Sequence, residues 1–190
     1  AQQYPHTKVG TLSYWYTRRP PATLKPHPNV QIQLCSIECC VLHAINDPNC
    51  PKNVEFCRDM NDWGKICDQI YIWNYNTNFS NYLLPLPNLR VIGPNIRYFV
   101  SNHAQGIFMQ AAGNANGAEM SELRTYLMSQ LLWDPARDEQ RLINEFLDLH
   151  YGRAAGPIRS YLQRIHERAE ASGRHHNCFG QLTDYGVDET

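Results

Sequence analysis

Four short segments of the chain have the composition of β-strands, and stretches with helical periodicity lie between and after them. The strand-like segments are residues 9–17, 30–35, 69–74 and 106–110, all rich in β-branched and aromatic side chains. The third and the fourth are each followed by a helix-like stretch. Because strands that alternate with helices are joined by crossover connections, this order predicts an α/β fold with parallel strands.

Five stretches are expected to be helical, and in the last three of them apolar residues recur with a period of 3.6 residues, which is typical of a helix with one buried face. They cover residues 59–68, 94–103, 118–133, 138–150 and 157–169. After the last of them the composition becomes polar. We therefore expect one folded unit over residues 1–171 and an irregular tail over residues 172–190.

The connection between the first two strands, residues 18–29, contains four prolines and cannot form an ordinary helix. Four strands are about half of a (β/α)8 barrel, which has about 250 residues in all. We therefore predict a partial TIM-like barrel of about four parallel strands followed by C-terminal helices. The alternative is a small open α/β sheet. The chain begins at Ala1 without a signal peptide, from which we infer a processed chain or a piece of a longer one.

Charge and cysteine content restrict the possible partners. The chain has 17 basic and 18 acidic residues, a net charge of −1, so nothing in its charge favours nucleic acid or an anionic membrane. Its seven cysteines are expected to be mostly buried thiols, although Cys50 and Cys57 could form a disulfide. The spacing of Cys35, Cys39 and Cys40 does not provide two zinc-ligand pairs, and His175 is expected to be solvated. We expect no metal and no cofactor.

Aromatic and polar side chains gather where each predicted strand ends, which is where (β/α) barrels place their active sites. Sugar rings stack on aromatic side chains, and sugar hydroxyls bind amides and carboxylates. The sequence therefore predicts a carbohydrate site, the alternative being that the aromatics belong to the core. The candidate substrate-binding residues are Trp15, Tyr16, Arg18, His43, Trp73, Asn74, Tyr75 and Gln110.

Glu38 is the candidate catalytic residue, because glycoside hydrolysis normally uses two carboxylates and Glu38 follows a strand. The alternative is that Glu38 forms a structural ion pair with Arg18. Glu119 is interpreted as a first-turn helix carboxylate, so the sequence shows no second catalytic carboxylate. The carbohydrate-site prediction requires Glu38, Asn74 and Met109 to open onto one shared pocket.

Several longer stretches resemble one known family. They are residues 37–40, 71–79, 82–89, 106–110, 122–127, 131–135, 145–147 and 151–152. Together they resemble an uncharacterised bacterial domain family, similar to glycoside hydrolases of the α-glucuronidase and β-hexosaminidase barrel type. The resemblance covers roughly residues 14–165 and implies that the chain is the C-terminal half of such a barrel. Asn74 stands where the family has Asp, and Met109 stands where it has Glu, which implies impaired catalysis.

Two classes of function follow from these observations. The first is a glycoside-hydrolase-like enzyme, of which this chain is an incomplete or impaired fragment. The second is a non-catalytic carbohydrate-binding or assembly module derived from a degenerate barrel. The expected partners are an oligosaccharide or glycan and either the missing N-terminal barrel half or a second copy, because a half-barrel exposes two sheet edges. The association with glycans favours a secreted or periplasmic protein.

Overall fold

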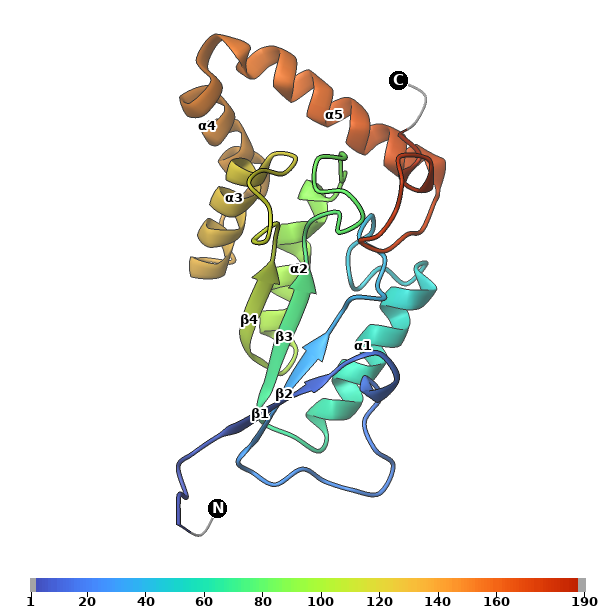
Figure 1. Cartoon of the computed structure of the whole chain (residues 1–190), viewed down its shortest axis with the longest axis vertical. Helices are drawn as coiled ribbons and strands as arrows, with labels where there is room; N and C mark the ends of the chain where they lie inside the picture. The colour runs from blue at the N-terminus through green and yellow to red at the C-terminus, as the bar shows by residue number, and fades with distance from the viewer. Residues whose placement is uncertain (1–2, 188–190) are drawn as a thin grey trace.

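The sheet has four parallel strands, as predicted, and they lie in sequential order. The computed structural model describes residues 3–187, and the strand order is β1-β2-β3-β4 with every neighbouring pair parallel (Figure 1). The strands are β1 (Val9–Ser13), β2 (Val30–Cys35), β3 (Ile70–Tyr75) and β4 (Ala104–Gln110). The first strand ends earlier than predicted, because Trp15 has a φ of 55° and begins a short 3-10 helix, η1 (Trp15–Thr17).

Two helices cover one face of the sheet. They are α1 (Pro51–Gly64), between β2 and β3, and α2 (Leu89–Ser101), between β3 and β4. Phe56 of α1 and Phe99 of α2 pack with the buried strand residues Leu34, Ile70 and Ile72 in one core cluster. Between β1 and β2 the described chain forms no α-helix, only the short η1, as expected from the four prolines of residues 18–29.

Both helices begin earlier than the sequence suggested. The first helix starts at Pro51, where the missing N–H of proline costs nothing. The second starts at Leu89 and contains Pro94 in its interior. The first backbone N–H of this helix, that of Leu89, donates a hydrogen bond to Nε2 of His166 at 3.0 Å, although His166 lies 77 residues further along the chain.

Three further helices form a second layer beyond the carboxyl ends of the strands. They are α3 (Ser121–Trp133), α4 (Glu139–Tyr151) and α5 (Ala155–Ser172), which Figure 1 shows beside and above the sheet. Their apolar faces meet in the larger core cluster. Asp138 caps α4 by accepting a hydrogen bond from the backbone N–H of Arg141 at 2.8 Å.

The segment after α5 docks on the loops that follow β2 and β3. Apart from a short 3-10 helix, η3 (Thr183–Tyr185), it is irregular up to residue 187. The N–H of Val41 donates to the carbonyl of His176 at 2.9 Å, and the N–H of Phe79 donates to the carbonyl of Cys178 at 2.8 Å. Cys178 and Tyr185 are fully buried, so this tail belongs to the core.

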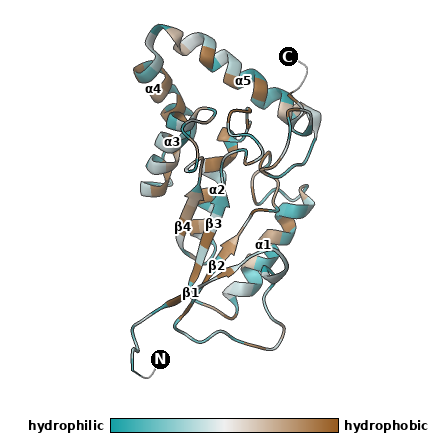
Figure 2. Cartoon of the chain, in the orientation of Figure 1, coloured by the Kyte–Doolittle hydropathy of each residue, from teal (hydrophilic) through white to brown (hydrophobic). Residues whose placement is uncertain are grey.

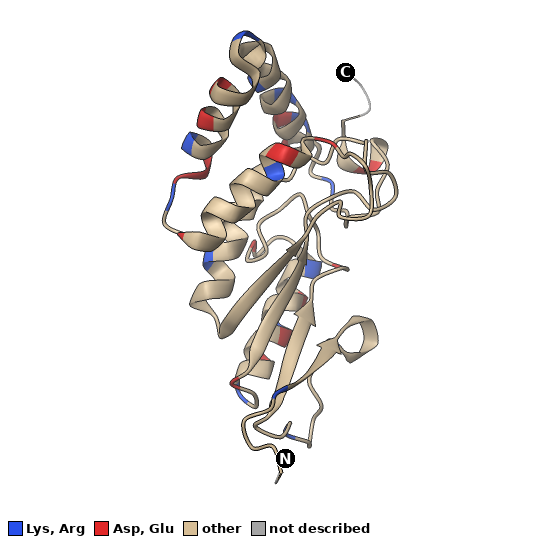
Figure 3. Ribbon diagram, turned by 60° about the vertical axis from the view of Figure 1, so that its left-hand side comes forward, with Lys and Arg blue, Asp and Glu red and all other residues tan. Residues whose placement is uncertain are grey.

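Hydropathy and charge follow the same layers. The strands carry no Lys, Arg, Asp or Glu, and the charged side chains lie on the helices and loops (Figure 3). In Figure 2 the strands are mostly hydrophobic, whereas hydrophilic and hydrophobic residues alternate along the helices. Within the described part of the chain, no helix is both long enough and apolar enough to cross a membrane.

Candidate functional site

The face of the sheet opposite α1 and α2 carries a group of aromatic side chains. We call Trp73, Tyr75, Phe108 and Gln110 the aromatic face. The ring of Trp73 contacts the ring of Phe108 edge-on, with 5.1 Å between the ring centroids, and stacks on the ring of Tyr75, with 6.2 Å between the centroids. Its Nε1 donates to Oε1 of Gln110 at 2.6 Å. Phe108 is 48% exposed, Trp73 and Gln110 are half-buried and Tyr75 is buried, so solvent reaches this face at Phe108.

Asn74 and Met109 lie on the other face of the sheet. They are paired in register between β3 and β4, and side chains alternate along a strand, so both point away from the aromatic face. The Nδ2 of Asn74 donates to Oγ of Ser36 at 2.9 Å, and Nδ2 of Asn76 donates to Oδ1 of Asn74 at 3.0 Å. Asn74 lines a cavity of only about 10 Å³, too small for a sugar.

Glu38 belongs to an ion-pair network centred on Arg18. The buried guanidinium of Arg18 contacts Oε2 of Glu38 at 3.2 Å, Oδ2 of Asp59 at 2.9 Å and Oε2 of Glu55 at 3.6 Å. The Nε1 of Trp63 donates to the Arg18 carbonyl at 2.7 Å, which fixes the backbone there. Glu38 therefore forms the ion pair with Arg18 that was considered as the alternative to a catalytic role.

The predicted site residues therefore occupy separate places. Glu38 and Met109 do not line the small cavity beside Asn74, so the structure does not bring these three into one pocket. Trp15 and Tyr16 are 57% and 89% exposed on η1. His43 lies in the loop after β2, five residues beyond Glu38.

One comparison with known proteins places the chain in a family. The family model described as Domain of unknown function (DUF4838) matches residues 1–163. The chain belongs to this family. No curated protein and no solved structure matches it. The match supports the predicted membership of an uncharacterised domain family, and the glycoside-hydrolase relationship stays a prediction.

This DUF4838 chain also brings together four potential metal ligands, Cys40, His43, Cys50 and His175. One ligand atom from each lies within 4.8 Å of all the others. Burial, together with the nearby Cys40, raises the pKa of Cys50 to about 11. Burial and the neighbouring His175 lower the pKa of His43. All seven cysteines are free, so the disulfide considered between Cys50 and Cys57 is not formed.

Sequence reasoning missed this cluster. It contains one local signal, because Cys40 and His43 are separated by two residues, a spacing typical of a zinc-ligand pair. The other two ligands, Cys50 and His175, are brought together only by the docking of the tail. His175, expected to be simply solvated, is exposed but stacks on the ring of His43 at 4.3 Å.

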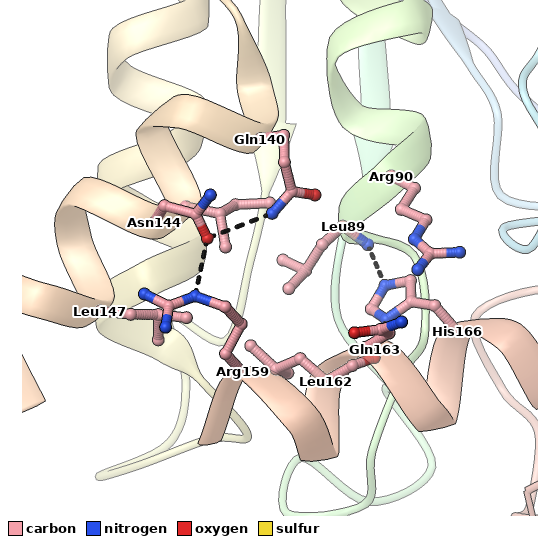
Figure 4. A pocket seen from close by; sticks show the side chains of 10 residues that line it. Leu89, Arg90, Gln140, Asn144, Leu147, Arg159, Leu162, Gln163 and His166 are labelled. Carbon is pink, nitrogen blue, oxygen red and sulfur yellow. Dashed lines mark hydrogen bonds between the residues drawn. The ribbon is translucent and has the colours of Figure 1, made fainter. Parts of the chain in front are cut away.

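A larger cavity of about 180 Å³ lies in the helical layer of the DUF4838 chain, between the start of α2 and helices α4 and α5 (Figure 4). His166 in its wall is neutral, since burial lowers its pKa to about 4 and its Nδ1 donates to the Leu162 carbonyl. Arg90 pairs with Glu170, and Arg159 binds other side chains of the helical layer. These wall groups already have protein partners, so the cavity is interpreted as a packing space.

Proposed function

We propose that this DUF4838 chain binds carbohydrate through its aromatic face, as part of a glycoside-hydrolase-like carbohydrate-processing domain. The observation that carries the proposal is the combination of Trp73, Phe108 and Gln110 on the accessible face of the sheet. Aromatic rings offer apolar surfaces on which the C–H faces of sugars stack. Because Gln110 uses its Oε1 to accept from Trp73, its NH₂ group remains to donate to a sugar hydroxyl.

The arrangement of the sheet supports the proposal that this is half of a (β/α)8 barrel. In doubly wound folds the strand order reverses and helices cover both faces. Here the order is sequential and both α1 and α2 pack on one face. In a barrel the other face is the interior, and catalytic residues lie at the carboxyl ends of its strands. An N-terminal barrel half or a second copy would then pair with the edges at β1 and β4.

Binding is favoured over hydrolysis by where the carboxylates lie. Glu38 is held by Arg18 at 3.2 Å, and the carboxylates that share this guanidinium, Asp59 and Glu55, are held in the same ion-pair network. Asn74 and Met109, which stand where the resemblance places carboxylates, point toward the helix-covered face. Turnover would therefore require a carboxylate supplied by another part of a complete barrel.

Titration calorimetry against a panel of oligosaccharides tests the binding proposal. We expect Trp73→Ala and Phe108→Ala to weaken binding by about tenfold or more, as loss of a central aromatic contact does. Trp133→Ala is the matched control, because Trp133 is 91% exposed on α3, outside the aromatic face. If no oligosaccharide binds, or if all three variants bind alike, the proposal is wrong.

A second candidate function is hydrolysis with Glu38 as the acid, and it is favoured only by the partial exposure of that side chain, 30%. The test is release of the aryl group from aryl-glycosides and aryl-glucuronides, with an N-terminal barrel half supplied in trans. Turnover abolished by Glu38→Gln would support it. Calorimetric binding without any turnover would leave the binding proposal intact and remove this one. Both candidates predict a secreted or periplasmic protein.

A further inference from the structure

We propose that Cys40, His43, Cys50 and His175 form a structural zinc site that fastens the C-terminal tail to the loop after β2. The zinc assignment does not rest on the proposed carbohydrate binding, since none of the four ligands belongs to the aromatic face. Three of the ligands come from the segment between β2 and the start of α1, and the fourth lies 125 residues further along the chain. Zinc would therefore join two segments that otherwise meet only through hydrogen bonds and packing.

The ligand atoms already have nearly the spacing that a tetrahedral zinc ion requires. With Zn–S bonds of about 2.3 Å and Zn–N bonds of about 2.0–2.1 Å, ligand atoms lie about 3.3–3.8 Å apart. The Sγ of Cys40 lies 3.2 Å from Nδ1 of His43, and the Sγ of Cys50 lies 3.2 Å from Nδ1 of His175. All four atoms fall within 4.8 Å of one another, so small rotations of the side chains suffice.

The loop that carries these ligands is held in place from within α1. Asn53, fully buried, accepts from the N–H of Cys40 at 2.9 Å through its Oδ1. Its Nδ2 lies within hydrogen-bond distance of the carbonyls of Cys40, His43 and Ala44. One amide therefore fixes the backbone on both sides of the Cys40–His43 pair. Such outer contacts orient ligands before the metal arrives.

The donor set selects the kind of ion. Two thiolates and two neutral imidazoles suit zinc, whereas calcium and magnesium prefer oxygen ligands. The two negative charges of the thiolates would balance the charge of Zn²⁺. With all four positions taken by protein side chains, the site has no open position for substrate, which is typical of structural zinc.

The ion would act by holding the tail. His175 immediately precedes the residue whose carbonyl accepts from Val41, and the tail then buries Cys178 against the loop after β2. Binding free energy at such a site adds to the free energy of unfolding. Chelation is therefore expected to release the tail first and to lower the melting temperature.

Metal analysis of the full chain refolded with Zn²⁺ provides the test. We expect one equivalent of zinc per chain in the wild type and background levels in His175→Ala. Because His175 is exposed, this variant should fold. The matched control is His176→Ala, which alters the neighbouring histidine outside the ligand set and should retain the full equivalent. Loss of zinc in both variants, or in neither, would overturn the proposal.

Thiol labelling gives a second readout that needs no substitution. In the zinc-loaded protein Cys40 and Cys50 should resist alkylation and should become reactive when a chelator is added. Cys57, which is partly exposed and outside the cluster, should react equally in both states. An intact mass lower by two hydrogens, with Cys40 and Cys50 joined, would show a disulfide instead and would also overturn the zinc assignment.

Discussion

Replacing Arg124 by Met should lower the free energy of unfolding far more than replacing a charged residue at the surface. Arg124 has the largest fully buried side chain in the described chain. Its guanidinium donates to Oε2 of Glu119 at 2.6 Å, to the Leu86 carbonyl at 2.6 Å and to Oδ1 of Asn88. These contacts join the segment before α3 to the segment before α2.

The size of the effect follows from what the substitution leaves behind. Glu119 would keep a nearly buried carboxylate without its cation, and one of its oxygens already lacks a partner. Removing one member of a buried ion pair costs about 3–5 kcal/mol. For a domain of this size, that corresponds to a fall in melting temperature of roughly 6–20 °C.

Urea unfolding followed by circular dichroism measures this cost. Arg159→Met is the matched control, because Arg159 pairs with Asp148 at the surface and should lose less than about 1 kcal/mol. A double-mutant cycle with Glu119→Gln should recover part of the loss, because it removes the unpaired charge. If Arg124→Met costs no more than the control, the argument from buried charge is wrong.

Three further measurements follow from the structure. The pKa of His166 is lowered from 6.5 to about 4, so the unfolded chain binds a proton there more readily than the folded chain does. The free energy of unfolding should therefore fall by about 3 kcal/mol as the pH drops from about 6.5 to about 4. In urea titrations His166→Ala should remove this pH dependence, and an unchanged pH dependence would contradict the assignment. Asp59→Asn should cost about 3 kcal/mol in the same assay, because Asp59 is the nearest partner of the buried Arg18, and a neutral effect would argue against that pair. Leu34→Ala should cost about 2–5 kcal/mol, since Leu34 is fully buried between the sheet and its helices, and a cost below about 1 kcal/mol would place it outside the core.

The parallel sheet could be predicted because its determinants are local. The alternation of Val30, Ile32 and Leu34 marks a strand, and the prolines of residues 18–29 exclude a helix before it. The start of the helix at Leu89 could not be predicted from local sequence, because the acceptor for its first backbone N–H is His166. A partner 77 residues away leaves no sign in the local sequence.

The candidate site was harder to predict, although one part of it was available. Trp73, Asn74 and Tyr75 are consecutive on one strand, so the period of two already requires Asn74 to face away from the other two. Applying that rule would have separated Asn74 from the aromatic face before any coordinates were known. The pairing of Glu38 with Arg18, in contrast, depends on how α1 packs, and the sequence left both interpretations open.

The two proposals meet at the loop after β3. Tyr75, on the aromatic face, contacts Phe79 edge-on at 5.8 Å, and Phe79 contacts Phe179 of the tail at 5.8 Å. A zinc ion at His175 would therefore hold a tail that supports the end of the aromatic face. Loss of zinc should then weaken sugar binding indirectly, by loosening Tyr75, while substitution of Trp73 should weaken sugar binding with the zinc content unchanged. Because substitution of Trp73 leaves the zinc content unaltered, the sugar-binding proposal can fail while the zinc proposal stands.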